Sequence, residues 1–332
     1  MLPITDFRAL LQQRKSLIID GALATELEAR GHDLNNALWS AKLLQNDPGS
    51  IQQVHLDYYL AGADIAITAS YQASTRGLSE HLGLNEREAA ELVKRSVKIA
   101  HDARSDAYNQ LNAAAIPKAA DTERKLLVAG SVGPYGAYLS DGSEYRGDYQ
   151  RTLDEFKDFH RRRIGALVDA NVDLLAIETI PSMPEIEALC SLLQNEFPGA
   201  VAWISCTLRD ADHLSDGTSM SDVFGLVSKY EQIVGFGVNC VPVQLVAPWL
   251  LHMQAIVGEC TTTDAIPVLL CYPNSGEVYD AESKAWSGPK PVGHVMGNQA
   301  TKWIAGGARL VGGCCRTGPK DIAGIAAKFQ QQ

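Results

Sequence analysis

Short apolar runs alternate with longer amphipathic stretches along almost the whole chain. The runs are rich in Val, Ile and Leu, which is typical of strands that are buried on both faces and joined by helices. Eight runs predict strands, at Leu17–Ala22, Ala63–Ser70, Leu126–Gly133, Val172–Thr179, Val201–Leu208, Ile233–Cys240, Ile266–Pro273 and Ala308–Cys315. The spacing of these strands leaves room for a helix after nearly every one.

The intervening stretches repeat apolar residues every three or four positions, the period of a helix with one buried face. Helices are predicted at Glu86–Ala107, Leu153–Ala170, Glu185–Gln194, Met220–Tyr230, Val243–Ile256 and Pro319–Phe329. Eight strand–helix pairs in 332 residues predict an α/β fold, a (β/α)8 TIM-type barrel with residues 1–332 as a single domain. An open doubly wound sheet is the alternative, but no glycine-rich dinucleotide turn follows the first strand.

Composition narrows the class of protein further. The 39 acidic and 29 basic side chains give a formal net charge of -10 without a basic block, which argues against nucleic acid as a partner. No apolar run approaches the ~20 residues that cross a bilayer, and the first residues lack the apolar core of a signal peptide. We therefore expect a soluble, cytoplasmic protein without a membrane partner. Seven cysteines are too few for a disulfide framework, so reduced thiols are expected.

Three of these cysteines lie at strand ends. Cys240 ends the sixth predicted strand, and the adjacent Cys314 and Cys315 end the eighth. If those strand ends meet in one parallel sheet, three thiolates can share one ion, which for sulfur ligands in an intracellular enzyme is most often zinc. Successive strand residues face opposite sides, so the pair can share an ion only if the strand ends there, as Gly312 and Gly313 permit. A vicinal disulfide is the strained alternative.

The remaining cysteines are assigned no metal. Cys190 falls in a predicted helix and Cys260 in a loop, and both are interpreted as structural. Cys206 and Cys271 lie near strand ends, so they are the residues that a mutational test of the metal site must exclude. Taken alone, Cys240 would also be interpreted as a small buried apolar residue.

Two carboxylates accompany the cysteines. Asp20 and Glu178 each come near the end of a predicted strand, where burial of a charge is costly unless a partner requires it. A positively charged group, such as the ammonium of an amino acid, would suit two of them. The alternative for each is a carboxylate that caps a helix or accepts backbone N–H groups.

Three thiolates on Zn²⁺ leave a charge of about -1, which makes the ion a weak Lewis acid. A thiol substrate is a better fourth ligand than water, because a coordinated thiol is deprotonated and becomes a nucleophile. None of the eight histidines ends a predicted strand. A Ser-His-Asp or histidine-rich metal hydrolase is therefore poorly supported.

Over nearly its whole length the chain resembles the zinc-dependent homocysteine S-methyltransferases. Gly237-Val-Asn-Cys240 and Gly312-Gly-Cys-Cys315 are similar to the zinc motifs of that family. Asp20-Gly21 and Glu178-Thr179 are similar to the motifs whose carboxylates hold the homocysteine amino group. The resemblance implies Cys240, Cys314 and Cys315 as zinc ligands and no catalytic group beyond the activated substrate thiolate. It also implies Asp20, Gly21, Glu178 and Asn239 in the substrate site.

The branch that uses S-methylmethionine is the most similar. Segments that carry this likeness include Ala66-Ile-Thr-Ala-Ser-Tyr-Gln-Ala-Ser74 and Asp141-Gly-Ser-Glu-Tyr-Arg-Gly-Asp-Tyr149. In the family an aromatic residue lies near the methyl donor at the position of Trp39, and Tyr71 falls in a related segment. Ordinary core packing is the alternative for both aromatic residues. The segment Ala113–Arg124 departs from the family and is expected to be a surface-loop insertion.

These observations give a leading hypothesis with two alternatives. A sulfonium, S-methylmethionine or S-adenosylmethionine, donates a methyl group to zinc-bound homocysteine and methionine forms. Selenocysteine or another small thiol or selenol could replace homocysteine as acceptor. A zinc-storage or redox-sensing protein without turnover is the remote alternative, although storage would not require Asp20 and Glu178. The partners are thus small molecules, with the oligomeric state left open and a monomer favoured.

Overall fold

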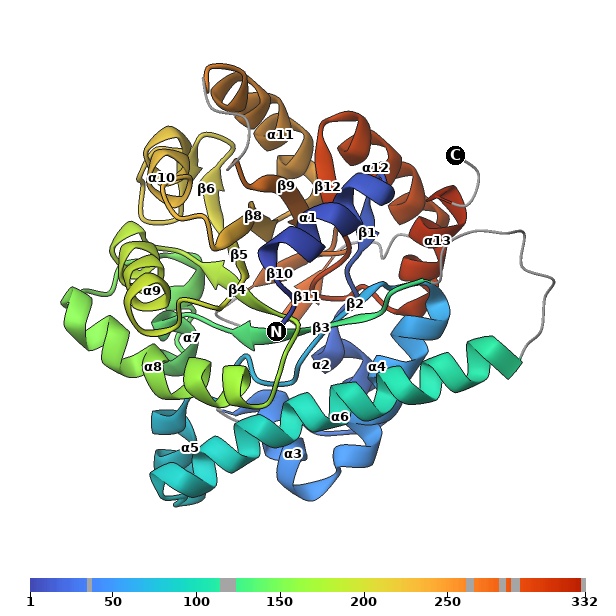
Figure 1. The fold of residues 1–332 in the computed structure, drawn as a ribbon, viewed down its shortest axis with the longest axis vertical. Coiled ribbons are helices and arrows are strands. Elements are labelled where there is room, and N and C mark those ends of the chain that lie inside the picture. The colour runs from blue at the N-terminus through green and yellow to red at the C-terminus, as the bar shows by residue number, and fades with distance from the viewer. Residues whose placement is uncertain (35–37, 114–123, 261–265, 281–284, 288–292, 330–332) are drawn as a thin grey trace.

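Eight parallel strands form a barrel inside a ring of helices in this computed structural model (Figure 1). The structure describes residues 1–34, 38–113, 124–260, 266–280, 285–287 and 293–329. The barrel strands are β1 (Leu17–Ile18), β2 (Ile65–Ile67), β3 (Leu127–Val132), β4 (Leu174–Ile180), β5 (Ala202–Cys206), β8 (Ile233–Asn239), β9 (Val268–Tyr272) and β12 (Ala308–Val311). Each falls within a predicted strand, except that β4 runs one residue further, to Ile180.

The strand order shows that the sheet closes on itself. It runs β1-β12-β9-β8-β5-β4-β3-β2, and every neighbouring pair is parallel. An isolated parallel bridge between Ile19 and Ile65 joins the two ends of this order. The predicted TIM-type barrel is confirmed, and the open doubly wound sheet is excluded.

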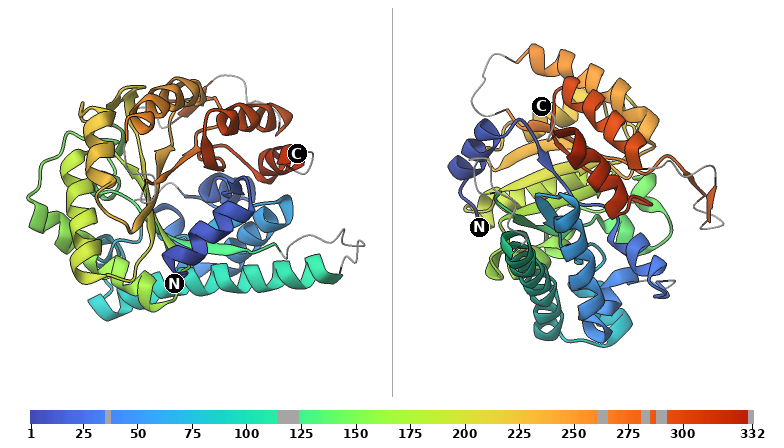
Figure 2. Two further views of the ribbon diagram at one scale, coloured as in Figure 1. Left: turned by 45° about the horizontal axis from the view of Figure 1, so that its top comes forward. Right: turned by 90° about the vertical axis from the view of Figure 1, so that its right-hand side faces the viewer.

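The helices follow the strands in the expected alternation (Figure 2). They are α1 (Ile4–Gln13), α2 (Leu23–Ala29), η1 (Trp39–Lys42), α3 (Leu43–Asn46), α4 (Pro48–Ala61), α5 (Thr75–Leu82), α6 (Glu86–Ala113), α7 (Tyr135–Leu139), η2 (Ser143–Tyr145), α8 (Leu153–Asp169), α9 (Met183–Glu196), α10 (Met220–Val227), α11 (Val243–Gly258), α12 (Gly293–Ala305) and α13 (Pro319–Phe329). The six predicted helices are present as α6, α8, α9, α10, α11 and α13. Two hairpins lie outside the barrel, β6 (Leu208–Asp210) with β7 (His213–Leu214) and β10 (Val278–Asp280) with β11 (Ala285–Ser287).

Local sequence explains where several helices begin and end. Thr152 and Glu155 form a capping box at the start of α8, in which each side chain accepts the backbone N–H of the other. Asp47 caps α4 directly before a proline at its first turn, and Gly62 ends that helix with a φ of 115°. No helix among the described residues is long and apolar enough to cross a membrane.

Alternate strand residues divide the core into two layers. On β4, Leu174 and Ala176 join the cluster inside the barrel, whereas Leu175 and Ile177 pack between the strands and the helices. The interior cluster also includes Phe7 and other residues of α1, which lies across the amino-terminal end of the barrel (Figure 1). That end is filled, so a site can open only where the strands finish.

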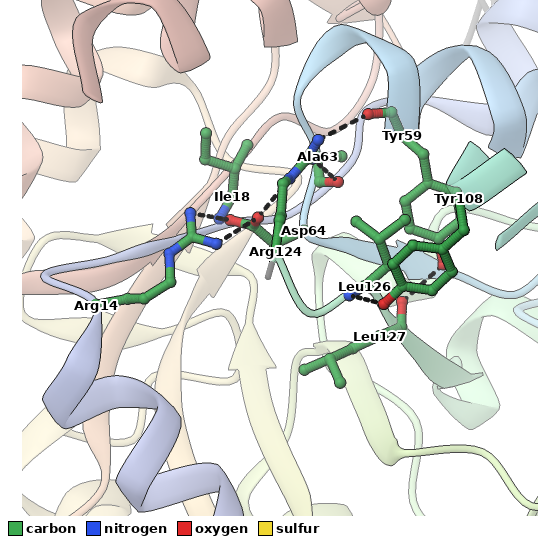
Figure 3. A network of polar contacts seen from close by, with 9 residues as sticks. All are labelled: Arg14, Ile18, Tyr59, Ala63, Asp64, Tyr108, Arg124, Leu126 and Leu127. Atoms are coloured by element: carbon green, nitrogen blue, oxygen red, sulfur yellow. Dashed lines mark hydrogen bonds and ion pairs between the residues drawn. The ribbon is translucent and has the colours of Figure 1, made fainter. Parts of the chain in front are cut away.

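Two aspartates hold β1 against β2, where the barrel closes. Asp64, which is fully buried, accepts the Ile18 N–H at 2.9 Å, and its carboxylate lies between Arg14 and Arg124 (Figure 3). At the other end of the same pair of strands, Asp20 Oδ2 accepts the Ile67 N–H at 2.9 Å. β1 is only two residues long, so these carboxylates accept hydrogen bonds that the backbone of a longer strand would accept.

We predict that Asp64→Ala destabilises the fold by about 3–5 kcal/mol, because it leaves two guanidinium groups and one backbone N–H without their buried acceptor. Urea unfolding followed by circular dichroism would measure the loss. Asp102→Ala is the control, since Asp102 pairs with Lys98 on the exposed surface of α6 and its loss should cost under about 1 kcal/mol. Equal losses in the two variants would contradict this account of the closure.

Candidate active site

A cavity of about 140 Å³ lies at the carboxyl ends of the strands. The residues that line it include Asp20, Gly21, Tyr71, Glu178, Asn239, Cys240, Cys314 and Cys315. These were all predicted as site residues, and they come from the ends of β1, β2, β4, β8 and β12 and the segments that follow. The other predicted residue, Trp39, begins η1, and its side chain lies outside the described part of the structure.

The three cysteines converge, although their strands are not direct neighbours. Their Sγ atoms all lie within 4.8 Å of one another, the one group of at least three possible metal ligands found among the described residues. β9 lies between β8 and β12, and the segment at its end joins both cysteine-bearing turns. Cys240 N donates to Tyr272 O, and Cys314 N donates to Pro273 O at 2.8 Å. The end of β9 therefore positions the cysteines.

The backbone leaves strand geometry at both places, as predicted for the vicinal pair. β12 ends at Val311, and a Cβ atom at Gly312 would lie 2.7 Å from Ile19 O. A glycine is thus needed where this turn passes β1. On the other strand, Cys240 has a φ of 51°, which ends β8 and turns its side chain toward the cavity.

An ion pair supports the turn after the vicinal cysteines. Arg316 has a φ of 68° and contacts Glu277 through two parallel bonds of 3.2 Å and 3.1 Å. Ser275 N also donates to Cys315 O at 3.1 Å. The segment after β9 and the segment after β12 are therefore joined by both backbone and charged contacts.

The sulfurs of Cys240 and Cys314 lie at bonding distance, with Cα atoms 5.4 Å apart, so this pair can also form a disulfide. Cys315 Sγ lies 3.8 Å from Cys240 Sγ and is not bonded to it. The physical reason is the convergence itself, since sulfurs close enough to share an ion are also close enough to oxidise. The two arrangements exclude each other, and three-thiolate metal binding requires this disulfide to be reduced.

The surroundings of Cys315 favour a cation beside its sulfur. Burial, with added repulsion from Glu144 and Glu178, raises the pKa of the Cys315 thiol to about 12. A thiolate there needs a positive charge close by, as a metal ion would provide. The donor set and its environment thus fit a thiophilic ion.

Cys206 and Cys271 are separated from this cluster by strand parity. Both are fully buried in the layer between the strands and the helices, where burial raises their thiol pKa values. Tyr272, which directly follows Cys271, faces the interior of the barrel instead, as the alternation of strand residues requires. Cys190 lies within α9 and Cys260 follows α11, also outside the cluster.

Asp20 and Glu178 lie in the cavity as a pair of buried carboxylates. Glu178 accepts hydrogen bonds from Ser131 Oγ and, at 3.2 Å, from the Tyr272 hydroxyl. Burial raises the pKa of Glu178 to about 7. Burial also raises the pKa of Asp20 well above its ordinary value, and the charge of Glu178 adds to this effect. Two such carboxylates provide a site for an ammonium group.

Asn239 and Gly21 line the cavity, and both determine the course of the backbone around it. Asn239 Oδ1 accepts the Thr179 N–H at 2.7 Å, and Asn239 Nδ2 donates to Thr179 Oγ1 at 2.8 Å. These bonds hold Thr179, a β-branched residue, at a φ of 64° that it would otherwise avoid. At Gly21, a Cβ atom would lie 2.7 Å from Thr317 O, so only glycine fits there.

Tyr71 is supported from behind by a buried charged network that sequence reasoning missed. Arg163 on α8 donates to Tyr71 O at 2.8 Å and to Gly133 O, at the ends of β2 and β3. Its guanidinium also contacts His160 Nδ1, and His160 Nε2 lies 2.7 Å from Glu185 Oε1. Arg163 shares the apolar face of its helix, a signal that could have revealed it.

Glu144 was also missed as a site residue. It lines the cavity from η2, within a loop whose sequence is similar to the branch that uses S-methylmethionine. A lone glutamate in a polar loop carries no signal of burial, so only the fold reveals its position.

Comparisons with known proteins agree with this geometry. The family model for homocysteine S-methyltransferase matches residues 17–329. Homocysteine S-methyltransferase of Escherichia coli (strain K12) is 50% identical over 97% of this chain and 97% of its own. Selenocysteine methyltransferase of Astragalus bisulcatus is 41% identical over 97% of this chain and 94% of its own.

Solved structures give the same result. The metallated and oxidised forms of the homocysteine methyltransferase MmuM from Escherichia coli each match with a TM-score of 0.83 at 48% identity. Each match covers 97% of this chain and 99% of the solved chain. The fold and the cavity define a barrel enzyme with a thiol cluster and paired carboxylates. This chain belongs to the homocysteine S-methyltransferase family, as its motifs indicated.

We predict that Cys240→Ala, Cys314→Ala and Cys315→Ala each lose the bound metal in the reduced protein. Loss of a group that only hydrogen-bonds to a metal ligand weakens metal binding by ~10–100-fold, and loss of a ligand should weaken it more. Inductively coupled plasma mass spectrometry of dialysed protein would measure the metal content. Cys206→Ala and Cys271→Ala are matched controls that should retain it, because both sulfurs face the helix layer. Metal loss in either control, with the fold intact, would contradict the assigned cluster.

Proposed function

We propose that this protein, with residues 1–332 as one homocysteine-binding domain, transfers a methyl group from a sulfonium to homocysteine to form methionine. The observation that carries this proposal is the three-thiol cluster beside two buried carboxylates in one cavity. Family membership supports the acceptor, and the sulfur donor set supports zinc as the ion. A cytoplasmic location and a monomeric state remain predictions.

Cys240, Cys314 and Cys315 would hold the zinc, which would lower the pKa of a bound substrate thiol and so supply the nucleophile. Asp20 and Glu178 would bind the amino group of homocysteine and orient its sulfur toward the cysteines. This orientation reduces the entropy cost of the reaction, because the acceptor is held before the donor arrives. The buried carboxylates would be stabilised in their charged form by the ammonium that they bind.

The transfer itself neutralises the charges on the two reacting sulfurs. The S–CH₃ bond of the donor breaks with its electron pair left on the donor sulfur, and a new S–CH₃ bond forms on homocysteine. The cationic donor becomes a neutral thioether. A thioether is a weak metal ligand compared with a thiolate, so both products can leave.

S-methylmethionine is the favoured donor, because segments such as Asp141-Gly-Ser-Glu-Tyr-Arg-Gly-Asp-Tyr149 are similar to the branch of the family that uses it. Selenocysteine is the second candidate acceptor, favoured by the 41% identical selenocysteine methyltransferase. A non-catalytic thiol protein is disfavoured, since it would not need the paired carboxylates.

Methionine formation from homocysteine would test the proposal, with reduced, zinc-loaded protein and S-methylmethionine, S-adenosylmethionine or betaine as sole donor. We expect activity with S-methylmethionine and little with betaine. Competition between homocysteine and selenocysteine would then establish the acceptor. The absence of methionine with every sulfonium would refute the proposed function.

We also predict a pH dependence of homocysteine binding. The raised pKa of about 7 means that Glu178 must release a proton to bind an ammonium below that pH, so affinity should rise toward neutral pH and level off above it. The limiting slope is about tenfold per pH unit. Isothermal titration calorimetry on reduced, metal-free protein would measure this pH dependence. Without a metal the substrate thiol does not lose its proton on binding, so that proton does not contribute to the slope.

Glu178→Gln is the control for this prediction. The variant should bind homocysteine more weakly and with a smaller slope, and any slope that remains would come from Asp20. An unchanged slope in Glu178→Gln would show that another group titrates.

A further inference from the structure

Glu144 is a third buried carboxylate in the cavity, and neither the metal cluster nor the ammonium site uses it. Glu144 lines the cavity, it is only 8% exposed, and its buried Oε2 atom has no hydrogen-bond partner among the described residues. Nearby, Arg146 pairs with Asp148 at 2.8 Å on the exposed side of the loop. A buried acceptor without a donor is costly in a folded protein, so its presence points to a ligand.

The backbone of Glu144 is fixed by its neighbours. Thr207 Oγ1 donates to Glu144 O at 2.8 Å, which ties η2 to the end of β5. A Cβ atom at Gly136 would lie 2.7 Å from Glu144 N, so α7 and η2 pack in close contact. The backbone that carries the carboxylate is therefore fixed by packing rather than part of a loosely packed loop.

Charge interactions place Glu144 near Tyr71 and the cysteine cluster. The charges of Glu144 and Glu178 both act on Tyr71 and on Cys315. Only Glu178 acts on Asp20, which identifies those two carboxylates as neighbours. The cavity thus has a neighbouring pair of carboxylates, Asp20 and Glu178, and a third carboxylate near the thiols.

We propose that Glu144 binds the sulfonium group of the methyl donor, between Tyr71 and the cysteine cluster. This inference rests on the proposed function and names the donor subsite within it. The aromatic face of Tyr71 suits the same cation, since a ring attracts a positive charge through its quadrupole. Asp20 and Glu178 would then hold the acceptor, and Glu144 would hold the donor.

The chemistry of the transfer explains why one unpaired carboxylate is useful here. The donor enters as a cation, and its sulfur becomes neutral when the S–CH₃ bond breaks. A carboxylate beside that sulfur binds the cationic donor more tightly than the neutral thioether that remains. The charge of Glu144 would therefore promote both donor binding and product release. Because Glu144 stabilises the cation that the reaction consumes, it should act on donor binding rather than on the rate of the chemical step.

A pair of matched probes would test the proposal on the reduced, zinc-loaded, full-length protein. S-methylmethionine carries the sulfonium, and 2-amino-5-methylhexanoic acid has the same shape with a neutral carbon in place of the charged sulfur. Wild-type protein should bind the sulfonium more tightly than its carbon analogue, by calorimetry. In Glu144→Gln this preference should fall by about 10–100-fold, the contribution expected of one hydrogen bond or contact to a charged group.

Kinetics and controls separate this role from a structural one. The KM for donor should rise in Glu144→Gln, while the KM for homocysteine stays within about twofold and the kcat does not fall. Glu144→Asp keeps the charge and should recover part of the preference. Asp148→Asn removes a charge from the exposed side of the same loop and should leave the preference intact.

Two results would overturn the proposal. An unchanged preference in Glu144→Gln would show that the carboxylate does not contact the sulfonium. An equal loss of affinity for both probes would show that it holds a group they share. The calorimetry needs no turnover, so a wild-type protein that forms no methionine would refute the proposed function and still allow this test. If Glu144→Gln does not fold, a full preference in Glu144→Leu would overturn the proposal equally.

Discussion

Closure of the barrel between β1 and β2 is the constraint on which the site depends. β1 contributes two ladder residues, and a single bridge between Ile19 and Ile65 completes the ring. Asp64 and Asp20 supply acceptors above and below this bridge, so side chains do what a longer strand would do elsewhere. Without closure, the strand ends would not form one rim, and residues from the two ends of the chain could not share a cavity.

Within that rim, β9 has a role that its own sequence does not suggest. It contributes no metal ligand, yet its last residues bond to the backbone of Cys240 and Cys314 from either side. The hydroxyl of Tyr272 also donates to Glu178. The thiol cluster and Glu178 are therefore held by one strand, which makes their relative placement a property of the sheet rather than of flexible loops.

Much of this arrangement could be predicted from the sequence, and the remainder has a physical explanation. Apolar runs located the eight barrel strands but not the strands of the two hairpins, and residue type at strand ends identified the cysteines with Asp20 and Glu178. The convergence of the sulfurs was predicted, but the pairing of Cys240 with Cys314 was not, because the cysteine count and the expected compartment favoured reduced thiols. Arg163 lies on the apolar face of its helix, where the periodicity could have revealed it. Burial of Glu144 depends on contacts between segments distant in sequence, about which local periodicity carries no information.

Asp20 illustrates how one residue can become resistant to evolutionary change. Its Oδ2 atom serves the architecture, as the acceptor for Ile67, and its charge faces the cavity beside Glu178. Asparagine would keep the acceptor but lose the charge, and glutamate would keep the charge but lengthen the arm that reaches β2. Each substitution satisfies one requirement and violates the other. The side chain is thus fixed by the joint demands of folding and ligand binding, and a change in substrate preference is easier at positions that bear only one of them.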